Sequence, residues 1–170
     1  MHYSSAKSDK LCIRLTAPDY GNIIILAASK QQILKTLIVD DESLARRGLV
    51  HRLKNIADIE IVGEARNGRE ALKLIKEKRP DLVFLDIQMP GINGFEVVQQ
   101  LDIETMPIIL FLTAYDKYAV QAFEVNALDY VLKPIDEERL QQVLDKVRVN
   151  LNQKRALKHK RLLMKLVSNI

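Results

Sequence analysis

Short apolar runs alternate with segments of helical periodicity along the chain from Leu34 onward. The runs lie at 37–39, 59–62, 82–85, 108–112 and 130–132. Several of them are apolar at consecutive positions, which is typical of strands that are covered by helices on both faces. The pattern therefore predicts five parallel strands.

Five helix patterns lie between and after these runs, each with apolar residues three or four positions apart. They are marked by Ala45, Gly48, Leu49, Leu53 and Ile56; Ala71, Leu72 and Ile75; Phe95, Val98 and Leu101; Ala119, Ala122 and Phe123; and Leu140, Val143, Leu144 and Val147. Turn residues separate the elements at Asn67-Gly68, Asn93-Gly94 and Lys133-Pro134, and Asp136 is placed to cap the last helix. We expect an α/β fold with a doubly wound open sheet and a crevice at the carboxyl ends of the strands.

Length and composition indicate a globular protein with one hydrophobic core. The chain has 170 residues, 48% of them hydrophobic, which suffices for one core but not comfortably for two. No apolar run is long enough to span a membrane, so no membrane partner is expected. The single cysteine, Cys12, and the lack of a secretory signal pattern favour the cytoplasm. An aromatic content of 5% with no Trp disfavours base stacking on many rings.

Charge is distributed unevenly along the chain. The net charge is +4, but residues 36–149 hold 15 basic and 20 acidic residues, whereas residues 150–170 hold six basic residues and no acidic ones. The acidic middle repels phosphate at long range. DNA binding by this chain would therefore depend on its two ends alone.

Polar residues follow four of the predicted strands directly. Asp40 and Asp41 follow the first strand and Asp86 the third, while Thr113 and Lys133 follow the fourth and fifth. If the first and third strands are neighbours, three carboxylates converge at one edge of the sheet. Two carboxylates about 4 Å apart repel by roughly 4 kcal/mol at an effective dielectric near 20, so the cluster implies a cation. Oxygen ligands in a partly solvated crevice suit Mg²⁺.

This combination is typical of phosphoryl transfer. Asp86 would act as the nucleophile and form an acyl phosphate, with Mg²⁺ and Lys133 neutralising the phosphoryl oxygens and Thr113 donating a hydrogen bond. Taken singly, each acid would more often be a solvated loop carboxylate or a helix cap, and Glu42 is read as a first-turn helix residue. The occurrence of all these groups at successive strand ends favours a site.

Two other functions, a phosphohydrolase and a nucleotide-binding protein, fit the residues at the strand ends less well. A phosphohydrolase of the haloacid dehalogenase type carries a second Asp two residues after its nucleophile, and Gln88 stands at that position. A nucleotide-binding protein needs glycines after the first strand so that a pyrophosphate can approach, and residues 41–44 contain none.

The motifs resemble the receiver domain of bacterial two-component response regulators. The match covers 34–149 and rests on five segments, at 37–42 (LIVDDE), 85–91 (LDIQMPG), 93–94 (NG), 113–114 (TA) and 133–134 (KP). The stretches at 113–116 (TAYD), 122–130 (AFEVNALDY) and 133–135 (KPI) more narrowly resemble receivers of LytTR-type transcriptional regulators.

The resemblance implies a flavodoxin-like five-stranded parallel sheet in the order 2-1-3-4-5 with five helices. It implies that Asp86 accepts a phosphoryl group from a sensor histidine kinase or a small phosphodonor, and that the domain is a switch and not a turnover enzyme. Asp41, Asp86 and the backbone carbonyl of Gln88 would hold Mg²⁺, with Asp40 acting through water. The Lys133–Pro134 peptide is a candidate for the cis form.

The resemblance also implies a switch that joins Thr113 to Tyr130. Phosphorylation would draw Thr113 inward, Tyr130 would follow, and the face made by the fourth helix, fifth strand and fifth helix would repack. That face would then form a homodimer or bind an output module. The alternative for Tyr130 is an ordinary strand aromatic packed on the fourth helix.

The two ends of the chain fall outside the receiver pattern. Residues 1–33 are expected to form a poorly ordered extension, and residues 150–170 a basic helical extension or linker. A long coiled coil is disfavoured because heptads continued from the last helix meet Lys154 and Lys158. We expect control of transcription, with DNA bound only if an output domain absent from this chain is present. The alternative is a stand-alone receiver that acts through a protein partner without DNA.

Overall fold

The structure is a computed structural model that describes residues 33–114 and 127–167. The helix predicted around Ala119, Ala122 and Phe123 lies outside these residues, as does nearly all of the extension at 1–33. Within the described part, the chain forms a single α/β unit that begins at β1 (Leu34–Val39).

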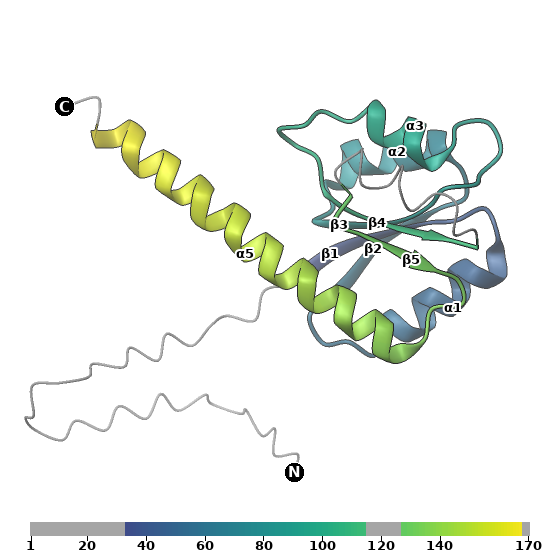
Figure 1. Cartoon of the computed structure of the whole chain (residues 1–170). Coiled ribbons are helices and arrows are strands. Elements are labelled where there is room, and N and C mark those ends of the chain that lie inside the picture. The colour runs from purple at the N-terminus through teal and green to yellow at the C-terminus, as the bar shows by residue number, and fades with distance from the viewer. Residues whose placement is uncertain (1–32, 115–126, 168–170) are drawn as a thin grey trace, which may run out of the picture. The chain divides into compact units, whose positions relative to one another are not determined.

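In the described part of the chain, five parallel strands form one sheet in the order β2-β1-β3-β4-β5 (Figure 1). The strands after β1 are β2 (Ile59–Ala65), β3 (Leu82–Asp86), β4 (Ile108–Thr113) and β5 (Asp129–Leu132). Every residue of β3 and β4 is buried, which explains why these runs are apolar without alternation. The predicted strands, their direction and their order are confirmed.

Four helices are described, namely α1 (Ser43–Leu53), α2 (Gly68–Lys78), α3 (Gly94–Gln99) and α5 (Glu137–Val167). Two residues assigned to helices from their spacing lie just beyond them. The N–H of Ile56 bonds to the carbonyl of Leu53, and the N–H of Leu101 bonds to that of Val98, so each follows a tightened last turn. Both side chains still pack against the core, which is the property that the spacing detects.

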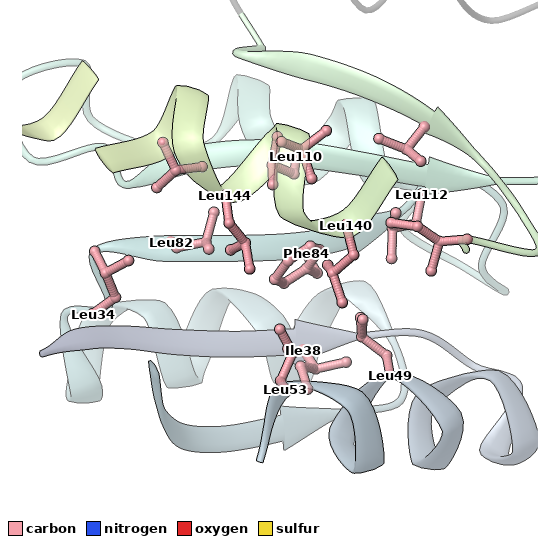
Figure 2. Packing of buried hydrophobic residues seen from close by; sticks show 14 of the residues in the cluster. Leu34, Ile38, Leu49, Leu53, Leu82, Phe84, Leu110, Leu112, Leu140 and Leu144 are labelled. Atoms are coloured by element: carbon pink, nitrogen blue, oxygen red, sulfur yellow. The ribbon is translucent and has the colours of Figure 1, made fainter. Parts of the chain in front are cut away.

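The helices cover both faces of the sheet, with α1 and α5 on one side and α2 and α3 on the other (Figure 1). On the first side, Ile38, Phe84 and Leu110 of the strands pack among Leu53 of α1 and Leu144 of α5 (Figure 2). Each of these five side chains is fully or almost fully buried. This two-sided core holds the strands rigidly, and thereby fixes the loops at their carboxyl ends.

Side-chain caps begin three of the helices, at the predicted cap Asp136 and at two residues that were predicted only as turns, Asn67 and Asn93. The side chain of Asn67 accepts a hydrogen bond from the N–H of Glu70, and Asn93 forms a reciprocal capping box with Glu96. Asp136 Oδ1 accepts the N–H of Arg139 at 2.7 Å, as its position ahead of the last helix predicts. The caps place α3 and α5 immediately after the loops that follow β3 and β5.

The helix α5 continues far past the receiver pattern, so that residues 150–167 are helical. Arg148 forms a bidentate ion pair with Asp58, the residue before β2, with both N–O distances at 2.7 Å. One side of the helix is buried as far as Leu151, and Arg155 then reaches Asp81, just before β3, at 3.4 Å. Among the described residues, no helix combines the length and apolar composition that a membrane crossing requires.

Candidate functional site

The predicted polar residues lie at one edge of the sheet. Asp40 follows β1, Asp86 ends β3, Thr113 ends β4 and Lys133 follows β5. Since β1, β3, β4 and β5 are neighbours in that order and run parallel, their carboxyl ends share this edge. The sheet order therefore brings together residues that are far apart in the chain.

Three carboxylates converge at this edge. Asp40, Asp41 and Asp86 each offer one oxygen atom, and these atoms all lie within 4.8 Å of one another. The residues Asp40 and Asp86 are only 4% and 5% exposed, whereas Asp41 is exposed. A donor set made only of oxygen atoms, with one side open to solvent, fits a hard divalent cation that keeps part of its water shell.

Lys133 supplies the positive charge of the cluster. Its Nζ lies 2.7 Å from Oδ2 of Asp40 and 2.8 Å from Oδ2 of Asp86. Its backbone N–H bonds to the carbonyl of Thr113 at 2.8 Å, which fixes the start of the loop after β5. The Lys133–Pro134 peptide is cis, as the resemblance implies.

Burial and charge act on the acid–base properties of this pair in opposite directions. Burial raises the pKa of the Asp86 carboxyl above its usual value, although the hydrogen bond and charge of Lys133 partly offset that effect. Burial alone would lower the pKa of Lys133, but its hydrogen bonds to Asp40 and Asp86 outweigh burial and raise it. Lys133 therefore stays protonated, as a counter-charge to the carboxylates must.

The backbone around Asp86 is held by close packing against the start of α3. A Cβ atom added at Gly94 would lie 2.5 Å from the carbonyl oxygen of Asp86, so only glycine permits this approach. The N–H of Gly94 bonds to the carbonyl of Ile87 at 2.9 Å, and the N–H of Gln88 bonds to Oδ1 of Asp86 at 3.3 Å. The carboxylate is thus oriented by its own loop.

The loop after β1 is held by a different set of contacts. Glu42 is the N-cap residue of α1, and its N–H bonds to Oδ1 of Asp40 at 2.9 Å. Arg46 Nη1 donates to the carbonyl of Asp40 at 2.6 Å, and Arg46 Nε donates to Glu64 at 3.2 Å. Sequence reasoning missed Arg46 and Glu64, although an arginine in the first turn of a helix that follows an acidic loop is a signal for such a contact.

The remaining predicted residues, Thr113 and Tyr130, lie on the neighbouring strands β4 and β5. Thr113 is fully buried and directly follows Leu112, the register partner of Asp86. Tyr130 is half-buried in β5, where it pairs with Phe111 and packs against the core on the side of α2 and α3. Its predicted neighbour, the fourth helix, lies outside the described residues.

Comparison with known proteins agrees with this arrangement. Residues 36–145 match the family model of the response regulator receiver domain. The transcriptional regulatory protein BtsR of Escherichia coli K12 is 54% identical over 116 residues, which cover 68% of this chain and 48% of that protein. An uncharacterized response regulatory protein of Vibrio cholerae is 51% identical over 115 residues, with the same shares covered. The chain spans about half the length of these relatives.

Solved structures show the same fold. The REC domain of AraT, a response regulator from Geobacillus stearothermophilus, aligns with a TM-score of 0.67 and 34% identity, covering 73% of this chain and 99% of that one. The response regulatory domain of mrkE from Klebsiella pneumoniae aligns with a TM-score of 0.64 and 36% identity, covering 71% and 99%. Together with the family model, which matches well over half of the residues, these likenesses show that the chain belongs to the response regulator receiver domain family.

Proposed function

We propose that Asp86 is the phosphoacceptor of this receiver domain. The observation that carries the proposal is the buried Asp86 carboxylate, with Lys133 at 2.8 Å and the carboxylates of Asp40 and Asp41 close by. Receiver domains of this family generally accept a phosphoryl group from a kinase. The donor would be a phosphohistidine of a sensor histidine kinase, or a small molecule such as acetyl phosphate.

In this reaction an oxygen of the Asp86 carboxylate attacks the phosphorus atom and forms an acyl phosphate. The bond from phosphorus to the donor breaks, and its electron pair stays on the imidazole nitrogen or, with acetyl phosphate, on the acetate oxygen. The ammonium group of Lys133, 2.8 Å from Oδ2 of Asp86, would balance the negative charge that spreads over the phosphoryl oxygens. The product is the phosphorylated chain itself, so the protein would act as a switch and not as a turnover enzyme.

The acidic edge supports Mg²⁺ as the cofactor, since receiver domains generally bind Mg²⁺ at an acidic pocket. Asp41, Asp86 and the backbone carbonyl of Gln88 would hold the ion, and Asp40 would act through water. When bound, the ion would offset the charge of the carboxylates and of the incoming phosphoryl group. Asp40 is already engaged by Lys133 and by the N–H of Glu42, which suits the indirect role.

We infer a switch that runs from Thr113 to Tyr130. Thr113 is buried beside the strand that carries Asp86, and its hydroxyl would donate to the phosphoryl group. Movement of Thr113 would favour another position of Tyr130, which lies on the neighbouring strand. Moving a two-state equilibrium from 1:99 to 99:1 takes about 5.5 kcal/mol, which a few charge-assisted hydrogen bonds to a phosphoryl group supply.

The output that we propose is control of transcription, as the name of the relative BtsR supports. Residues 34–149 would act as the receiver, the basic segment at 150–170 as a helical extension or linker, and 1–33 as a separate extension. After phosphorylation, two copies would form a homodimer through the face made by the fourth helix, β5 and α5. The protein would act in the cytoplasm. DNA would be bound only if an output domain is present in addition to these segments. A receiver that acts through a protein partner without DNA is the alternative.

The proposal is tested by incubating the chain with acetyl phosphate and Mg²⁺ and measuring its intact mass. We expect one added phosphoryl group, which hydroxylamine removes because it cleaves acyl phosphates. The variant Asp86→Asn should gain none. The variant Asp102→Asn is the matched control, since Asp102 is an exposed carboxylate in the loop after α3 and should be modified like the wild type.

Two results would contradict the proposal. One is full modification of Asp86→Asn, and the other is an adduct that hydroxylamine leaves in place. The homodimer is measured separately, by light scattering of the chain with and without beryllofluoride, a phosphoryl mimic. A monomer under both conditions would favour the alternative in which the receiver acts through another protein.

A further inference from the structure

The side chain of Arg46 connects the ends of two neighbouring strands beneath the acidic loop. Its Nη1 donates to the backbone carbonyl of Asp40 at 2.6 Å, after β1, and its Nε donates to Oε2 of Glu64, near the end of β2, at 3.2 Å. The two strands are paired at this point, with Ile38 opposite Glu64. The Arg46 side chain is 17% exposed and that of Glu64 is 43% exposed, so the contact with the Asp40 carbonyl is better shielded from water than the contact with Glu64.

The carbonyl that Arg46 binds belongs to the peptide group between Asp40 and Asp41. Its orientation determines the direction in which the exposed Asp41 side chain leaves the backbone. Asp40 is held on two other sides, because its N–H bonds to the carbonyl of Ala65 at 3.0 Å and its Oδ1 accepts the N–H of Glu42. The contact with Arg46 completes the set of bonds that fixes this peptide.

Lys133 and Arg46 contact different groups of the acidic loop and cluster. Lys133 bonds to carboxylate oxygens of Asp40 and Asp86, which belong to the acidic cluster. Arg46 bonds to the backbone of Asp40 and leaves those oxygens available. A guanidinium group suits this position, since its planar fork donates to two acceptors in fixed directions, which an ammonium group does less well.

We infer that Arg46 is a positioning residue that holds the loop of Asp40 and Asp41 in the geometry required to bind Mg²⁺, without touching the ion. The inference rests on the proposed function, because it assigns a supporting residue to the same site. Groups that orient metal ligands from behind commonly change metal affinity by about 10- to 100-fold when they are removed. A group that only stabilises the fold would change the fraction of folded protein and leave the affinity of the folded chain unchanged.

The test compares Arg46→Ala with Arg47→Ala. Arg47 is the next residue of α1 and is exposed, and among the described residues it donates only to the carbonyl of Ser43 within its own helix, at 3.3 Å. The Mg²⁺ dissociation constant of each chain is measured by isothermal titration calorimetry. We expect it to rise about tenfold or more in Arg46→Ala and to stay within about twofold of the wild type in Arg47→Ala.

Kinetics with acetyl phosphate provide a second readout. The Mg²⁺ concentration that gives half the maximal rate should rise in Arg46→Ala as the dissociation constant does. The rate at saturating Mg²⁺ should stay within about twofold of the wild type, because the ion restores the loop when it is bound. The conservative variant Arg46→Lys, which retains one donor for the Asp40 carbonyl, should recover part of the affinity.

Changes at Glu64 test the same contact if Arg46→Ala fails to fold. Glu64→Gln keeps an oxygen that accepts from Arg46 and should bind Mg²⁺ almost as the wild type does, whereas Glu64→Ala frees one side of the guanidinium and should weaken binding by a smaller factor. Wild-type affinity in folded Arg46→Ala would overturn the inference and leave the proposed function standing, and so would wild-type affinity in Glu64→Ala if Arg46→Ala does not fold. A wild-type chain that binds no Mg²⁺ would instead refute the proposed function, and this inference with it.

Discussion

The ammonium nitrogen of Lys133 lies 2.8 Å from Oδ2 of Asp86, although 47 positions separate the two residues in the chain. The same nitrogen also reaches Asp40, so one positive charge serves two buried carboxylates. Buried ions that lose their partner are costly, because no water replaces the lost interaction. The cluster therefore links the chemistry of the site to the stability of the fold.

Replacing Lys133 with methionine should make stability depend on Mg²⁺. Without the ion, Asp40 and Asp86 would face each other with no counter-charge, and we expect the free energy of unfolding at neutral pH to fall by ~3 kcal/mol. Added Mg²⁺ should restore a large part of this loss, because the ion binds the folded chain. The rate of phosphorylation should fall at least ~100-fold. Urea unfolding with EDTA and with Mg²⁺ measures the first effect.

The matched control is Lys146→Met on α5. Lys146 pairs with Asp129 at 2.7 Å, but its side chain is more than half exposed, so its loss should cost less than ~1 kcal/mol. If the charge of Lys133 had no special role, the two variants would have the same free energy of unfolding. Equal stability of the two variants in EDTA would therefore contradict the prediction.

The pair of Asp58 and Arg148 should make the stability of α5 sensitive to acid. The hydrogen bond from Arg148 holds the pKa of the Asp58 carboxyl below its usual value in the folded chain, against the opposing effect of burial. The pair thus stabilises the fold at a pH above the unfolded value of about 4, and this contribution is lost as the pH falls through the folded pKa. We expect Asp58→Asn to lower the free energy of unfolding by ~1–2 kcal/mol at pH 7, and by little at a pH below both pKa values.

A second partner of the same arginine gives the control for that experiment. Asp145 also bonds to Arg148 at 2.7 Å, but its side chain is 71% exposed, so Asp145→Asn should change stability by less than ~0.5 kcal/mol at any pH. Chemical unfolding from pH 3 to pH 8 follows both variants. A deficit in Asp58→Asn that persists unchanged at pH 3 would show that the ion pair is not its cause.

Any side chain at position 94 should destabilise the fold, because Gly94 lies against the backbone of Asp86. A Cβ at Gly94 meets the Asp86 carbonyl oxygen at 2.5 Å, which forces α3 or the loop to move, and we expect Gly94→Ala to cost ~1–3 kcal/mol. Gly48→Ala in α1 is the opposite case. Its added Cβ would lie 3.7 Å from the Arg52 side chain, so alanine should raise stability by ~0.5–1 kcal/mol through its helix propensity. Thermal unfolding of both variants distinguishes the two effects.

Replacing Arg79, the C-cap residue of α2, with glycine should stabilise the fold. It has a φ of 46°, in the left-handed region, and its N–H bonds to the carbonyl of Ile75 as a helix cap. A side chain makes this conformation unfavourable, and Arg79→Gly should therefore raise the free energy of unfolding by ~0.5–1 kcal/mol. Urea denaturation measures the change. A loss of stability would mean that the arginine side chain makes a contribution larger than the backbone strain.

Much of the site was predictable because it depends on strand order. Asp86 and Lys133 each come directly at the end of a predicted apolar strand, and a parallel sheet places such ends at one edge. Asp136 was also predicted as a cap, and Asn67 and Asn93 as turns that precede helices, since these signals act over a few residues of sequence. These features follow from local chemistry and from a small set of allowed topologies.

Other features depend on tertiary contacts that no local pattern contains. The pair of Arg148 and Asp58 joins residues 90 positions apart, and neither stands in a motif. Arg46 was missed partly for the same reason, because its partner Glu64 lies on β2, whereas its other partner, the Asp40 carbonyl, lies in the loop just before α1. The assignment of Leu101 to a helix was wrong because periodic spacing reports burial on one side, and a tightened turn after α3 buries the same side.

The continuation of α5 has a mechanical consequence. Arg148 and Arg155 attach the helix to the loops before β2 and β3, and past Arg155 it runs on for ~18 Å to Val167, at about 1.5 Å per residue. A stiff rod gripped near its middle acts as a lever. A tilt of ~10° where it is gripped would sweep Val167 through ~3 Å, since the rod keeps its length. A shift of the start of α5, which follows β5, would thus be carried to the far tip at about the same amplitude and in the opposite direction, because the two arms are about equally long.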